Sequence, residues 1–245
     1  MTMTHSQAVM MHIAIGSIGV VLFWGAMLSR KGSARHKAWG RPFLASLLAV
    51  AVSVGPLLLL RPGTFDPGYV VQFVYLSICV FTITGLAWTA IRWRDQPERF
   101  RGRHFRVMGP VLFLLGGLVL VAGLANGDPL PVVLSWVGLF HGALMMRFAW
   151  RRAPLLANWW LNWHITAMCS LFTAVHGTLL FVAWRWAVMP DADRLVSAGF
   201  HAGVLVIAIV MRLWFGPRLG VPLRFTQSLP ADARMTAAMP GAVRE

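Results

Sequence analysis

The chain has 245 residues, of which 58% are hydrophobic and only 12% are charged, with 8 acidic residues in all. A soluble domain is typically about one quarter charged, so this composition excludes a soluble globular protein. The formal net charge of +14 would suggest a nucleic-acid partner for a soluble chain. Here the basic residues gather at the ends of hydrophobic runs, so we expect a lipid bilayer as partner and no nucleic acid.

Seven hydrophobic runs follow one another along the chain, and each has the roughly 20 residues that cross the hydrocarbon core of a bilayer. Backbone polar groups in hydrocarbon must be satisfied within the chain, so we expect these runs to be α-helices. The predicted spans are residues 8–28, 42–60, 69–91, 107–125, 130–150, 158–184 and 194–214. The predicted fold is an all-α bundle of seven transmembrane helices (1–214), in which the short connection makes the fourth and fifth spans antiparallel neighbours. A proline-containing tail, 215–245, is expected to be partly disordered.

Lysine and arginine concentrate on alternate connections between the spans. Nineteen of them lie after the first, third and fifth spans or near the C-terminus, whereas only Arg61, Arg185 and Arg194 lie on the other side. Because cytoplasmic connections of membrane proteins carry the excess of basic residues, we expect the N-terminus outside and the C-terminus in the cytoplasm. The expected location is the cytoplasmic (inner) membrane of a bacterium.

Two of the basic connections resemble each other. Residues 31–41 read KGSARHKAWGR and residues 101–109 read RGRHFRVMG, so each places Arg-His before a glycine that begins the next span. This similarity suggests a duplicated helical hairpin, with the first two spans matching the third and fourth. His36 and His104 lie among basic residues at the predicted headgroup level, and we expect them to contact anionic lipid or to cap the following helix.

The pattern of His12 in the first span followed by Lys-Gly-x-x-x-His-x-x-x-Gly-Arg resembles an uncharacterised family of bacterial polytopic membrane proteins that carry a domain of unknown function. The resemblance covers residues 10–110. It implies a polytopic bacterial membrane protein and no particular reaction.

Several membrane activities are excluded by the residue types that the spans lack. Retinal proteins need a lysine in their last span, but the only lysines are Lys31 and Lys37, both between the first two spans. All eight acidic residues lie outside the spans, which argues against membrane zinc hydrolases and against the buried carboxylates of proton-coupled transporters. We identify no catalytic residues.

Histidines inside the spans are the strongest functional signal, because ionisable residues in hydrocarbon are costly and often mark function. At 1.5 Å per residue, four of them lie roughly 6 to 16 Å from the outer ends of their spans. These four are His12, His141, His176 and His201, each on a different span. His164 lies by itself nearer the inner ends.

Neutral imidazole is a common ligand of haem iron, copper and zinc. We therefore expect haem b, held by His176 and His201 as an axial pair with His12 and His141 as competing ligands. Such a protein would transfer electrons, with a redox partner or within a larger membrane complex. Copper or zinc could replace haem at the same histidines. The alternative is a cofactor-free accessory subunit or a carrier of a lipid or small molecule, whose histidines only form hydrogen bonds between helices.

Overall fold

The computed structural model describes residues 3–63, 66–150 and 154–225, and these ranges are helical with no β-strand. The helices in chain order are α1 (His5–Leu28), α2 (Ala34–Leu59), α3 (Pro67–Arg92), α4 (Pro97–Phe100), α5 (Arg103–Ala125), α6 (Pro129–Trp150), α7 (Trp159–Ala187) and α8 (Arg194–Arg218). Seven helical segments in the described ranges are long and apolar enough to cross a membrane, with the short α4 preceding α5 in the fourth. The predicted all-α, seven-span architecture is confirmed, and the protein is a multi-pass integral membrane protein.

Side-chain caps explain where several helices begin. Ser33 accepts a hydrogen bond from the backbone N–H of His36, and Asp66 and Asp193 cap α3 and α8 in the same way. Such caps satisfy backbone donors that have no partner within the helix. Because of the Ser33 cap, α2 begins at Ala34, well before the predicted start at residue 42. Hydropathy detects only the apolar stretch of a helix along its length, so it misses a first turn that contains basic residues.

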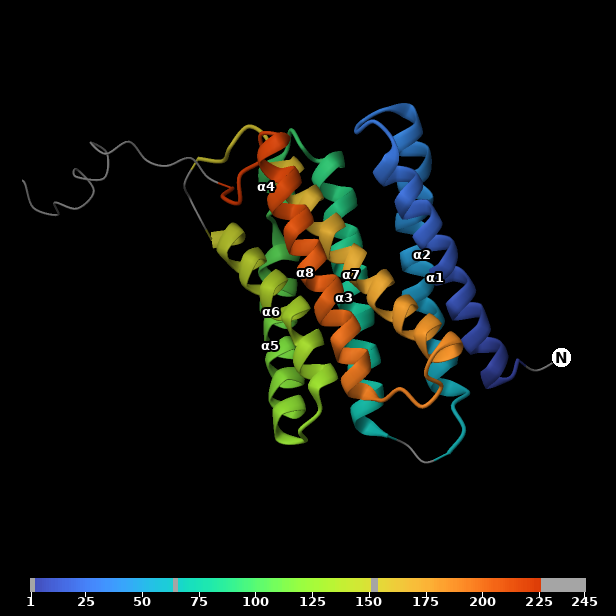
Figure 1. Ribbon diagram of the computed structural model, residues 1–245. Helices are drawn as coiled ribbons and strands as arrows, with labels where there is room; N and C mark the ends of the chain where they lie inside the picture. The colour runs from blue at the N-terminus through green and yellow to red at the C-terminus, as the bar shows by residue number, and fades with distance from the viewer. Residues whose placement is uncertain (1–2, 64–65, 151–153, 226–245) are drawn as a thin grey trace, which may run out of the picture.

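The helices are arranged as a central group flanked by two pairs (Figure 1). Helices α3, α7 and α8 form the centre, α5 and α6 pack on one side of it, and α1 and α2 pack on the other. The close pairing of α5 with α6 confirms the antiparallel neighbours predicted from their short connection. The suggested duplication does not extend to packing, because α1 packs on α2 whereas α3 packs mainly on α7, and α5 on α6.

The alternating direction of the spans brings the arginine-rich segments to one end of the bundle, uppermost in Figure 1. We call this the basic end: it comprises residues 29–33, residues 93–102, the end of α6, the start of α7 and the end of α8. The opposite end carries the start of α1 and the α2–α3, α5–α6 and α7–α8 connections. Which end faces the cytoplasm stays a prediction.

The segment after α8 folds back onto the basic end. Helix α8 continues to Arg218, and the N–H of Leu156 donates to the carbonyl of Phe225 at 2.9 Å. The Phe225 ring lies 4.9 Å from the Trp163 ring of α7, centroid to centroid. Residues 215–225 of the predicted tail therefore belong to the folded bundle, and residues 226–245, for which disorder was expected, lie outside the described residues.

Candidate histidine site

Three of the four candidate imidazoles form the same hydrogen bond to their own helix. In each, the ring Nδ1–H donates to the backbone carbonyl four residues earlier, at 2.8 to 3.0 Å. The pairs are His141 with Val137, His176 with Phe172, and His201 with Ser197. Since a carbonyl oxygen can only accept, Nδ1 carries the proton, and Nε2 of each neutral ring keeps a lone pair.

His12 of α1 has the same tautomer, fixed by a hydroxyl on α2. Its Nδ1 lies 2.7 Å from Ser53 Oγ, and the Ser53 hydroxyl already donates to the carbonyl of Val50 at 2.7 Å. The hydroxyl can therefore only accept from His12, which places the proton on Nδ1. All four candidate histidines thus present Nε2 as a base.

His176 of α7 faces α1. The indole N–H of Trp24 donates to His176 Nε2 at 3.0 Å, which agrees with the tautomer because an indole can only donate. The imidazole stacks on Phe172 with the ring centroids 4.0 Å apart, and its centroid lies 5.4 Å from that of Phe23. His176 is therefore enclosed in an aromatic interface between α1 and α7.

His201 of α8 packs against α7 immediately after His176. A Cβ at Gly177 would lie 2.7 Å from His201 Cδ2, so the imidazole can approach α7 this closely only because residue 177 is glycine. The Thr178 hydroxyl lies 3.3 Å from His201 Nε2 and donates to it. The predicted axial pair thus shares one region of α7, but His176 is directed toward α1 and His201 reaches α7 from α8.

His141 of α6 differs from the other three. It is completely buried, and its Nε2 has no hydrogen-bond partner within the described ranges. Its ring neighbours include Trp136 and Phe140 of the same helix. A buried polar atom without a partner costs about 1–3 kcal/mol, so His141 has the lone pair with the most to gain from a ligand.

The four histidines do not form one ligand cluster. The contacts above place His12 between α1 and α2, His176 between α1 and α7, and His201 between α7 and α8, while His141 lies on α6. In the part of the chain that the structure describes, no group of three or more His, Cys, Asp or Glu side chains could hold a metal ion. A shared depth in the membrane, which the sequence predicts, does not by itself bring side chains to one centre.

Two further histidines, His36 and His164, join helices near the basic end. His164 of α7 donates from Nδ1 to the carbonyl of Ala87 in α3 at 3.0 Å. His36 of α2 donates from Nδ1 to the carbonyl of Ala26 in α1 at 2.9 Å. His36 therefore binds the end of the preceding helix, while Ser33 caps the following one.

A buried arginine is the polar residue that the sequence analysis missed. Arg212 was counted only as one of the basic residues near the C-terminus, but its side chain is 8% exposed inside the bundle. Its guanidinium donates to Asn162 Oδ1 at 2.6 Å, to Thr166 Oγ1 at 3.2 Å and to the carbonyl of Pro222 at 3.3 Å. Its position inside the predicted span 194–214 was the available signal.

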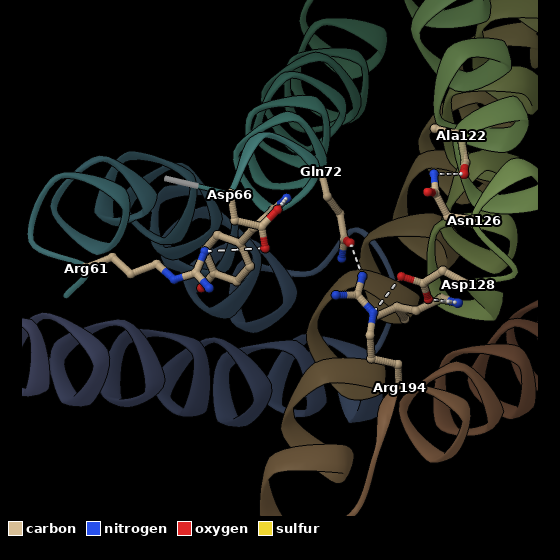
Figure 2. A network of polar contacts seen from close by, with 9 residues as sticks. Arg61, Asp66, Gln72, Ala122, Asn126, Asp128 and Arg194 are labelled. Atoms are coloured by element: carbon tan, nitrogen blue, oxygen red, sulfur yellow. Dashed lines mark hydrogen bonds and ion pairs between the residues drawn. The ribbon is translucent and has the colours of Figure 1, made fainter. Parts of the chain in front are cut away.

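An ionic network holds the opposite end together (Figure 2). Arg194, at the first turn of α8, lies 2.6 Å from Asp128 in the α5–α6 connection and donates to Gln72 of α3 at 2.9 Å. Asp128 also accepts from the backbone N–H of Leu130 at 3.1 Å, at the start of α6. The network fastens α8 to α3 and to the α5–α6 pair.

A scan against models of protein families finds no match, and neither does a search of curated proteins or of solved structures. The resemblance of residues 10–110 to an uncharacterised membrane-protein family therefore stays a prediction.

Proposed function

We propose that this integral membrane protein binds haem b, or a metal ion in its place, through histidines that the sequence places in the outer half of the bundle, and that it transfers electrons in a bacterial inner membrane. The observation that carries the proposal is the common tautomer of the four imidazoles. Ligating histidines typically donate the other ring N–H to a carbonyl or carboxylate, which orients the ring and increases its basicity. His141, His176 and His201 form this bond to their own helices.

Two protein nitrogens suffice to hold haem iron, and His176 and His201 lie on α7 and α8, which pack directly against each other. Haem, when bound, would supply a one-electron carrier. The chain's own contribution is to keep the proton on Nδ1 and the lone pair on Nε2. Trp24 and Thr178 now donate to these lone pairs, so both donors would turn away on ligand binding. His12 and His141 are the competing ligands, and His141 Nε2 has no donor to displace among the described residues.

The test is an absorption spectrum of the detergent-purified protein, expressed with added haem and recorded before and after dithionite. We expect a Soret band and reduced α and β bands that disappear in His176→Ala or His201→Ala. His164→Ala is the matched control, because it removes an intramembrane imidazole with the same bond from Nδ1 to a backbone carbonyl but nearer the basic end. A colourless wild-type protein that also lacks copper and zinc by elemental analysis would refute the proposal.

A second candidate function is favoured by the bonds that the imidazoles form between helices. Ser53 joins His12 to α2, Trp24 joins His176 to α1, and Thr178 lies against His201 of α8. Histidines that only form such bonds hold the helices together and bind no cofactor. The protein would then be a cofactor-free accessory subunit or a carrier of a lipid or small molecule.

Replacing Trp24 by Phe separates the two functions, since the substitution removes the indole N–H and keeps an aromatic ring. If His176 only forms a hydrogen bond between α7 and α1, the variant should lose about 1 kcal/mol of stability. It should also be colourless, as the wild type would be. If His176 is a ligand, haem content should be unchanged or higher, because the competing donor is gone. Trp88→Phe, another partly exposed tryptophan, controls for the loss of an indole.

A further inference from the structure

A pocket of about 470 Å³ opens between α1 and α2 at the basic end. Its size lies within the range of small-ligand sites, about 300–1,000 Å³. The wall includes the indole of Trp39, which lies directly against Gly25 of α1, and the side chain of Leu28, which is 81% exposed. The pocket thus has an aromatic and aliphatic side, in a region where tryptophans typically mark the membrane interface.

The polar side of the pocket carries two arginines and two serines, Arg30, Arg35, Ser29 and Ser33. Neither arginine belongs to any of the ion pairs found in the described ranges, whose carboxylates are Asp66, Asp95, Glu98 and Asp128. The pocket therefore concentrates positive charge that no nearby carboxylate of the described chain neutralises.

Of the two serine hydroxyls around the pocket, only that of Ser33 still has a hydrogen free to donate. Ser33 Oγ accepts from the N–H of His36, which leaves its hydrogen free to donate, whereas Ser29 already donates to the carbonyl of Gly25 at 2.6 Å. Lys31 turns back to the carbonyl of Met27 and does not line the pocket. The donors available to an anion are thus the two guanidiniums and the Ser33 hydroxyl.

We propose that this pocket binds the headgroup of an anionic phospholipid, with the phosphate at Arg30, Arg35 and Ser33 and an acyl chain along Leu28. Guanidinium groups match phosphate oxygens in two-point hydrogen bonds. The exposed leucine beside them favours a lipid over a soluble phosphate, because it would extend the contact into the hydrocarbon. The proposal is independent of the histidines and of any cofactor.

The test is native mass spectrometry of the full-length protein in detergent, titrated with phosphatidylglycerol or phosphatidylcholine. We expect the wild type to prefer phosphatidylglycerol. Losing a hydrogen bond to a charged group lowers affinity about tenfold or more, so Arg30→Gln and Arg35→Gln should each reduce that preference about tenfold. Both side chains are exposed, so the melting temperature without lipid should not change, and this is measured on the same samples.

Lys31→Gln is the matched control, since it removes one charge from the same connection without touching the pocket. We expect less than a twofold effect. A loss equal to that of either arginine substitution would show diffuse surface attraction and overturn the assigned site. Displacement of bound phosphatidylglycerol by millimolar inorganic phosphate would instead identify a soluble-anion site, and equal binding of the two lipids would also contradict the proposal.

Discussion

Arg212 shows how a cation can be held in an apolar bundle without a carboxylate. Isolated charges are expensive to bury, and the acceptors found around this guanidinium are all neutral: Asn162, Thr166 and the carbonyl of Pro222. Asn162 is 1% exposed and also donates its amide to the carbonyls of Pro222 and Arg224. One amide side chain therefore binds both the buried cation and the segment that follows α8.

Replacing Asn162 by Ala should strongly destabilise the protein. The change removes the closest acceptor of Arg212 and leaves the carbonyls of Pro222 and Arg224 with one donor fewer, and such losses at buried charged groups cost about 3 kcal/mol. The measurement is the free energy of unfolding in mixed micelles. The control is Asn126→Ala, which removes an exposed amide bound to the Ala122 carbonyl and should change stability by about 0.5 kcal/mol or less. Similar losses in the two variants would contradict this role of Asn162.

For single residues, the sequence predicted which polar side chains lie within the spans and at what depth, but not which residues they contact. The histidines were correctly identified as residues of apolar spans, because hydropathy locates a residue along a helix axis. Their partners depend on the rotation of each helix, which no periodic signal determined: Trp24 meets His176 across 152 positions of sequence. Arg212 was missed because counting charges by side treats every arginine near a span end as facing water.

Among the helices, α5 and α6 show what allows the closest packing. A Cβ at Gly116 of α5 would lie 2.7 Å from the backbone N of Leu139 and 3.0 Å from the carbonyl of Ser135 in α6. Small residues at such positions let backbones approach, and van der Waals contact then replaces the hydrophobic effect that is missing within a membrane. The existence of both helices and their pairing followed from hydropathy and the short connection. The glycine positions that form the contact could not be predicted in this way. Helix α5 has several glycines, and the sequence does not show which of them point toward α6.

The adjacent glycines of α5 give a sharp test of this contact. Gly116→Ala should destabilise the protein by about 2 kcal/mol, because the added methyl meets backbone atoms that cannot move aside. Gly117→Ala should be neutral or stabilising by up to about 1 kcal/mol, since nothing lies within 4 Å of its added Cβ and alanine favours the helix. Thermal unfolding in detergent compares the two directly. Equal effects would mean that α5 and α6 do not meet through Gly116.

For the whole molecule, the two ends of the bundle differ in how their charges are used. At the opposite end, Arg194 is paired with Asp128, and Arg61 lies 3.7 Å from Asp66. At the basic end, arginines greatly outnumber the carboxylates, and Arg30 and Arg35 are left to line the pocket between α1 and α2. Paired charges near the opposite end and surplus cations at the basic end fit a membrane whose inner leaflet is anionic.

This asymmetry predicts that the basic end faces the cytoplasm, because the membrane potential opposes the export of each cation by about 2.3 kcal/mol per 100 mV. Single cysteines at two exposed positions would test it: Lys37→Cys at the basic end and Asn126→Cys at the opposite end. In intact bacterial cells, whose outer membrane has been made permeable, a membrane-impermeant maleimide should label only Asn126→Cys. After lysis it should label both.

The wild type gives the background labelling of Cys79 and Cys169, both of which lie inside membrane-spanning helices. Labelling of Lys37→Cys in intact cells, with Asn126→Cys protected, would show that the orientation is the reverse of the predicted one. The candidate histidines would then lie in the cytoplasmic half of the membrane, and the lipid pocket would open to the outer leaflet, where the attraction of an anionic inner surface could no longer explain its two arginines.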